Sequence, residues 1–98
     1  MPKHVADELA VISLQGLLRV HGLTHLQARG HGDLLVIESG PKGKRVPHAR
    51  LRRAGVHLWW LELPTHTGRW ERTGFRGQIA QLLALLEDDF PWLLMPIA

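Results

Sequence analysis

The most distinctive run of charge in the sequence lies between Glu38 and Glu62, where no acidic residue occurs. Six cations fall in this interval, which we call the basic ribbon: Lys42, Lys44, Arg45, Arg50, Arg52 and Arg53. The chain is formally +3, so the basic ribbon carries +6 and the rest of the chain sums to −3. Guanidinium and ammonium groups concentrated in this way attract phosphates and carboxylates. The sequence therefore predicts a surface for a polyanionic partner.

Tryptophan adds a second recognition element to this basic ribbon. Trp59 and Trp60 lie on the strand predicted next, and adjacent residues of a strand point to opposite faces. We expect Trp60 to offer a stacking platform for bases beside the cations that hold phosphate. Phosphate contacts position a nucleic acid but do not read its sequence. The first prediction is thus a non-enzymatic module that binds RNA or DNA without strong sequence preference.

Two other functions are compatible with the same residues. A basic ribbon also suits a protein-interaction domain, of the adaptor, immunity or antitoxin kind, that docks an acidic partner. The segment containing His66, Arg69 and Glu71 carries the residue types of a small metal-independent ribonuclease. There His66 or Glu71 would move protons and Arg69 would stabilise the phosphorane. The simpler interpretation is a turn closed by threonine hydroxyls, and we predict no catalytic residue.

The seven histidines do not form a pattern typical of a metal site. The chain has no cysteine, which excludes disulfides and thiolate ligands. His21 and His25 would lie one helical turn apart, but Gly22 breaks the helix between them, and His31 lies in a glycine-rich turn. We interpret these as exposed or loop histidines and predict neither a metal nor another cofactor.

The basic ribbon needs a scaffold, and two helices are predicted at the ends of the chain. Apolar residues recur at helical spacing over 7–21, and Gly22 is typical of a left-handed helix stop. A regular stripe runs through 78–90, formed by Ile79, Leu82, Leu83, Leu86 and Phe90. Pro91 ends this second helix. We expect Trp92, Leu93 and Leu94 to pack back onto the sheet.

Strands are predicted between these helices at 23–29, 34–39, 48–53 and 58–63, with a short fifth strand at 69–75. Residues 48–53 alternate, with Ala49 and Leu51 on one face and Arg50 and Arg52 on the other. The expected fold is one α+β domain over residues 1–98. It consists of an antiparallel β-meander of four to five strands, with an N-terminal and a C-terminal helix packed on one face.

Location and assembly follow from composition. Residues 1–10 mix charges with apolar residues, unlike a signal peptide, and no apolar run is long enough to span a membrane. We therefore expect a cytoplasmic protein. Four tryptophans and the apolar tail 92–97 are more apolar surface than a small core can hide, so we also expect a homodimer.

Overall fold

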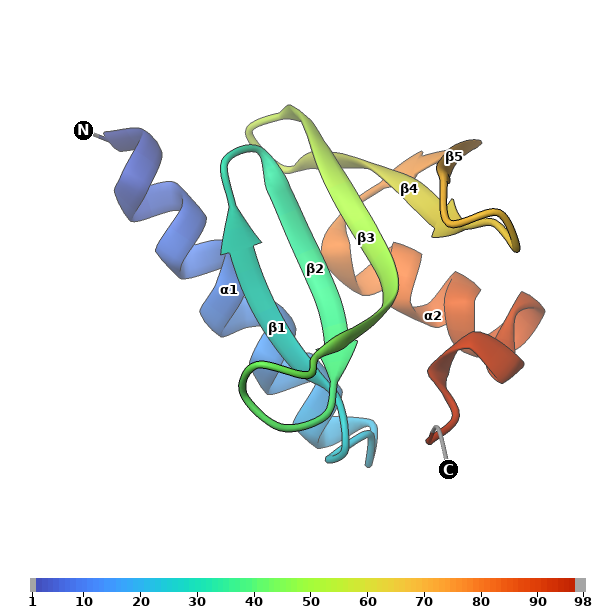
Figure 1. Cartoon of the computed structure of the whole chain (residues 1–98). Helices are drawn as coiled ribbons and strands as arrows, with labels where there is room; N and C mark the ends of the chain where they lie inside the picture. Colours follow the sequence, from blue (N-terminus) through green and yellow to red (C-terminus); the bar gives the residue numbers. More distant parts are fainter. Residues whose placement is uncertain (1, 97–98) are drawn as a thin grey trace.

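The computed structural model describes the backbone of residues 2–96 and the side chains of residues 8–96. The elements follow the order α1 (Pro2–Val20), β1 (Gln27–His31), β2 (Leu34–Ser39), β3 (Val46–Gly55), β4 (Leu58–Pro64), β5 (Trp70–Gly77), α2 (Ile79–Asp89) and the 3-10 helix η1 (Pro91–Leu94). The strands form one antiparallel sheet in the order β1-β2-β3-β4-β5 (Figure 1). The predicted α+β meander is confirmed, with five strands.

Both helices cover the same face of the sheet. Helix α1 lies behind β1, and α2 lies toward β4 and β5 (Figure 1). The core between these layers contains leucines of both helices and inward-facing residues of the central strands, among them Leu14, Leu18, Ile37, Leu61, Leu83 and Leu86. No described helix crosses the other side of the sheet, which we call the open face. None of the described helices is long and apolar enough to cross a membrane.

The end of α1 explains why β1 begins later than predicted. Gly22 adopts a positive φ of 75° and Leu23 N donates to the Leu18 carbonyl at 2.8 Å, which closes the helix as a Schellman motif. A further turn follows, in which Leu26 N donates to the Leu23 carbonyl. Residues 23–26 are therefore a turn, and the strand predicted over 23–29 starts at Gln27. The prediction mistook an apolar connection for strand.

Helix α2 ends close to where the sequence predicts. Gln78 is its N-cap, and Gln78 N donates to the Gln81 side chain at 2.8 Å as one half of a capping box. Phe90 is its C-cap, and Pro91 opens η1. Leu94 is buried as expected, but Trp92 is 63% exposed and makes an edge-to-face contact with the Phe90 ring. The expectation that Trp92 packs onto the sheet is wrong, and Ile97 of the tail lies outside the described residues.

The loop between β2 and β3 presents the two lysines of the basic ribbon. Gly40 has a φ of 101°, and a Cβ atom there would lie 2.8 Å from the Lys44 carbonyl oxygen. Only glycine fits this position without a backbone shift. The turn is closed by Lys44 N donating to the Pro41 carbonyl at 2.9 Å. Lys42 and Lys44 therefore lie on a compact exposed loop at one end of the sheet (Figure 1).

Candidate anion-binding face

The register of the strands places arginines in two rows across the open face. Residues that are paired in neighbouring antiparallel strands point to the same face of the sheet. One row consists of Arg29, Val36, Arg50, Glu62 and Arg72, and the other of His31, Leu34, Arg52, Trp60 and Arg76. Strands that are distant in the sequence thus contribute cations to one continuous surface.

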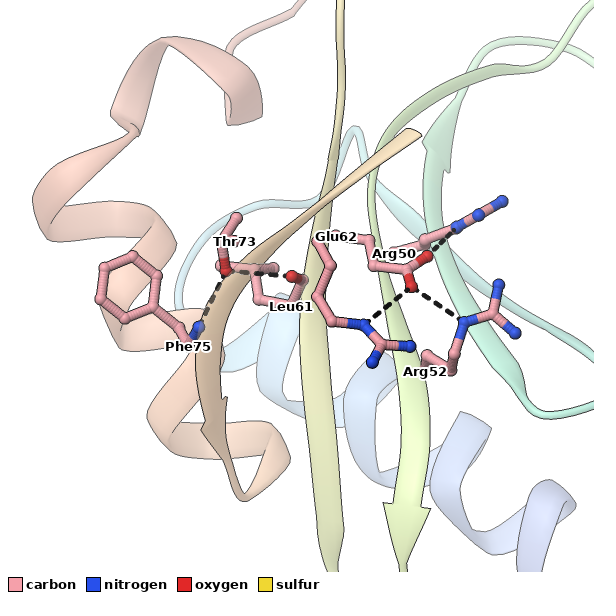
Figure 2. Close-up of polar contacts among 7 residues, drawn as sticks. Arg50, Arg52, Leu61, Glu62, Thr73 and Phe75 are labelled. Atoms are coloured by element: carbon pink, nitrogen blue, oxygen red, sulfur yellow. Dashed lines mark hydrogen bonds and ion pairs between the residues drawn. The ribbon is translucent and has the colours of Figure 1, made fainter. Parts of the chain in front are cut away.

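Glu62 organises the centre of this surface, and we call it and its arginines the Glu62 cluster. Arg50 Nε donates to Glu62 Oε1 at 2.6 Å, and Arg52 Nε donates to Oε2 at 2.8 Å. Arg72 Nε lies 3.8 Å from Oε2. The Glu62 side chain is only 6% exposed. Figure 2 shows its carboxylate between Arg50 and Arg52, with the terminal nitrogens of both guanidinium groups directed away from it.

The charge state of Glu62 follows from this environment. Burial raises the pKa of its carboxyl group, but hydrogen bonds from Arg52 and Arg50, together with their positive charges, lower it by more. The net pKa lies below the ordinary value of 4.5. Glu62 is therefore a carboxylate at neutral pH, and it holds two arginines through Nε while their outer nitrogens remain directed outward.

A bulge in β5 determines which residues of β4 its two arginines lie beside on the open face. Trp60 pairs with Arg76 and Glu62 pairs with Arg72, so two steps along β4 lie opposite four steps along β5, which bulges there. The Thr73 hydroxyl donates to the Leu61 carbonyl at 3.0 Å and accepts from Phe75 N at 3.1 Å (Figure 2). These bonds satisfy backbone groups that the bulge would otherwise leave without partners.

A second acid, Glu38, plays the same role nearer the β2–β3 loop, residues 40–45, which we call the lysine loop. We call this group the Glu38 cluster. Arg29 Nε donates to its two carboxylate oxygens at 3.1 and 3.2 Å, and Arg45 Nε lies 3.7 Å away. The Glu38 side chain is 4% exposed. Arg29, Glu38 and Arg45 line a hollow of about 380 Å³ together with Gly43 and Pro47. This hollow joins the open face to the lysine loop.

Two tryptophans complete the open face. The Arg50 guanidinium carbon lies 4.3 Å from the centre of the Trp70 ring. Arg72 and Arg76 lie over Trp60, at 5.1 and 5.2 Å from its ring centre. These are cation–π distances, so the rings hold guanidinium groups as well as offering apolar surface. Any base stacking on Trp60 must therefore share or displace an arginine.

The structure brings most of the predicted site residues together. Arg50, Arg52 and Trp60 lie on the open face, Arg45 joins its edge through Glu38, and Lys42 and Lys44 lie on the adjacent loop. Arg53 does not join them, because alternation along β3 turns it to the helix side. There its guanidinium carbon lies 4.7 Å from the centre of the buried Trp59 ring.

The segment with His66, Arg69 and Glu71 forms an ordinary turn. Thr65 N donates to the Arg69 carbonyl at 2.7 Å, and the Thr65 hydroxyl donates to the same oxygen at 3.0 Å. The side chains of His66, Arg69 and Glu71 are exposed. No hydrogen bond or ion pair joins any two of them in the described chain. This geometry provides no nucleophile, base and phosphate-binding group held at one point.

The buried histidine His48 links β3 to η1 and to the end of β2 through hydrogen bonds. Its Nδ1 atom donates to the Leu93 carbonyl at 2.6 Å, since a carbonyl only accepts, and its Nε2 atom lies 2.7 Å from the Ser39 hydroxyl. His25 similarly donates from Nε2 to the Leu94 carbonyl at 2.6 Å. Both histidines thereby anchor η1. Among the described residues, no three histidine or carboxylate side chains converge in a way that would hold a metal ion.

Sequence reasoning missed half of the open face. The missed residues are Arg29, Arg72, Arg76 and Trp70, and the two anchoring acids Glu38 and Glu62. The two acids served only to bound the basic ribbon in the sequence. The alternation of Trp70 and Arg72 along a strand was a usable signal, because it places both side chains on one face.

Comparisons with protein-family models, curated proteins and solved structures find no match to this chain. The fold and site together define an α+β meander. Among the described residues, its open face is crossed by no helix and carries six arginines and two buried glutamates, a formal charge of +4. Any functional conclusion therefore depends on the charge and geometry of this face.

Proposed function

We propose that the open face binds nucleic acid through its phosphates, without strong sequence preference. The observation that carries the proposal is the Glu62 cluster, in which a buried carboxylate orients Arg50 and Arg52 on a face that no described helix covers. The excess of positive charge on this face favours a polyanion over a neutral ligand. The lysine loop extends the same charge beyond the sheet edge.

Orientation by Glu62 matters because a free arginine loses conformational entropy when it binds a ligand. Arg50 and Arg52 are each held at Nε, so part of that cost is met on folding. Their outward nitrogens form a planar pair that suits the oxygens of a phosphate. Glu62 thus lowers the net charge of the open face by one, but it fixes the orientation of two arginine side chains.

The tryptophans support nucleic acid as the polyanion. Trp60 and Trp70 are half-buried among arginines on the open face. Bases of single-stranded nucleic acids stack on aromatic rings and on guanidinium planes, and such stacking tolerates any base. A face that combines both groups fits a flexible strand laid across the sheet.

The test is fluorescence anisotropy with labelled RNA and DNA oligomers at two salt concentrations. We expect affinity to fall steeply as salt rises, because each phosphate contact releases counterions. Arg72→Glu should weaken binding of every oligomer alike and reduce the salt slope by about one. Arg69→Glu is the matched control, because it makes the same charge change in the exposed turn outside the open face. Equal effects of the two substitutions, or no binding at low salt, would refute the proposal.

An acidic protein partner would bind the same arginines, so a competition experiment is needed to distinguish a nucleic-acid ligand from a protein ligand. A nucleic-acid-binding face should retain oligomers in the presence of an acidic polypeptide such as polyglutamate at equal charge concentration. Stacking on Trp60 is open to bases and not to carboxylates. Displacement of the oligomer by polyglutamate at equal charge would instead favour the acidic-partner function.

A further inference from the structure

The face of α1 that points away from the sheet is apolar and has no partner in the described chain. Leu9, Ile12 and Val20 lie along it at helical spacing, and they are 61%, 66% and 82% exposed. The opposite side of the helix supplies the buried residues Ala10, Leu14 and Leu18. A helix with one face in the core normally carries charge on the other. Here no charged residue occurs between Glu8 and Arg19.

Gly16 lies in the middle of this exposed face. A Cβ atom at Gly16 would meet nothing within 4 Å, so no contact among the described residues requires glycine there. Glycine within a helix is unfavourable relative to alanine. Its usual advantage in such a position is that another backbone or side chain can approach closely. Among the described residues, no backbone or side chain makes use of the close approach that Gly16 permits.

We propose that two copies of this chain pair in antiparallel orientation through the exposed face of α1, about a two-fold axis that passes that face at the level of residue 14. In such a pair, residues at equal distances on either side of the axis face each other, and each contact occurs twice. This arrangement sets Glu8 opposite Arg19, Leu9 opposite Val20, and Ile12 opposite Gly16. The midpoint of each pair lies within about half a residue of position 14, so a single antiparallel alignment of the two helices makes all three contacts.

Charge complementarity identifies the occupant as a second copy. Glu8 and Arg19 are about three full helical turns apart, so they lie along the same edge of the apolar face. A two-fold axis perpendicular to the helix preserves that edge and places each acid beside the partner's base. Both residues are exposed, and neither has an ion pair in the described chain. A face that is neutral in the middle and opposite in charge at its ends is complementary to itself.

The apolar surface continues beyond the helix, which adds to the contact area. Leu9 and Ser13 line a cavity of about 270 Å³ with Val56, Trp59 and Ile79. Val56, in the turn between β3 and β4, is itself exposed. A single helix pair is small for a stable interface. Because Val56 lies beside Leu9, the partner's Val20 would contact both residues. This pairing leaves the two open faces on opposite outer sides, so it is independent of the proposed nucleic-acid binding.

The test is sedimentation velocity over a dilution series, with each variant's fold checked by circular dichroism. The wild type should form a dimer that dissociates on dilution. Glu8→Arg and Arg19→Glu should each raise the dissociation constant by about tenfold, since each sets like charges together twice. The double variant Glu8→Arg/Arg19→Glu should restore wild-type dimerisation. Gly16→Leu should give a monomer, although leucine favours the helix more than glycine does.

Leu9→Glu and Met95→Glu form a matched pair, because both residues are 61% exposed and only Leu9 lies on the proposed interface. Leu9→Glu should dissociate the dimer and Met95→Glu should not. Three outcomes would overturn the proposal: a species of 11.1 kDa at every concentration of wild type, equal dissociation by the two substitutions, or a double charge swap as weak as the single ones.

Discussion

Arg50 on β3 and Glu62 on β4 face each other across the sheet, with Arg50 Nε 2.6 Å from Glu62 Oε1. In the sequence, Glu62 is the acid that ends the basic ribbon. In the fold it lies on the strand next to β3, where its carboxylate binds Arg50 and Arg52. The open face is therefore less positive than a count of its cations indicates, but its arginines are oriented.

Glu62 should contribute to stability as well as to orientation. Glu62→Gln keeps the size of the side chain but removes the charged acceptor of two arginines, so we expect a loss of about 1–3 kcal/mol of unfolding free energy at neutral pH. Urea denaturation measures this. Asp88→Asn is the control, because Asp88 is exposed near the C-terminal end of α2, where a negative charge is unfavourable. A loss no greater than that of Asp88→Asn would contradict the prediction.

The stability difference between wild type and Glu62→Gln should depend on pH in a defined direction. Because the folded pKa of Glu62 lies below 4.5, its contribution is fully present above 4.5 and is lost as pH falls through the lowered value. Urea denaturation in a series of acidic buffers should therefore show the two proteins converging at low pH. A difference that stayed constant across the series would show that ionisation of Glu62 is not the cause.

Lysine should not replace arginine at the centre of the open face. Arg50→Lys/Arg52→Lys keeps the formal charge, but a lysine nitrogen bound to Glu62 has no planar pair left for a phosphate. We expect oligonucleotide affinity to fall by about tenfold, or 1.4 kcal/mol. Arg69→Lys, in the exposed turn, should leave affinity unchanged. Unchanged affinity of the double variant would mean that charge alone binds the ligand.

Trp60 should matter for single strands more than for duplexes. Trp60→Ala should weaken single-stranded oligomers by about 1–3 kcal/mol and leave duplex binding nearly unchanged, because only unpaired bases stack on a side chain. Trp92→Ala is the control, since Trp92 is exposed outside the open face. Anisotropy with both kinds of ligand makes the comparison. An equal loss for single strands and duplexes would exclude base stacking on Trp60.

The packing of α2 should dominate the stability of the fold. Leu83 is 1% exposed in the core between α2 and the sheet. Leu83→Ala should cost about 2–5 kcal/mol through lost burial and the cavity that remains. Thermal and urea denaturation measure the cost. A loss below about half a kilocalorie per mole would be too small for a fully packed leucine.

Local patterns in the sequence predicted most of the elements. The strand Leu34–Ser39 has its predicted bounds, and α2 ends at the caps Gln78 and Phe90 that bound the predicted helix. Alternation along β3 also predicted that Arg50 and Arg52 share a face. These features depend on neighbouring residues alone, through helical periodicity, strand alternation and capping.

Features that depend on distant residues were decided only by the tertiary structure. The pairing of Glu62 with Arg50 requires the register between β3 and β4, and the bulge in β5 sets Arg72 opposite Glu62 and Arg76 opposite Trp60. Alternation gives the face of a residue within its own strand, but register and bulges determine which side chains of other strands lie beside it. The basic ribbon was therefore visible in the sequence, whereas the carboxylates that orient its arginines became apparent only once the strands were paired.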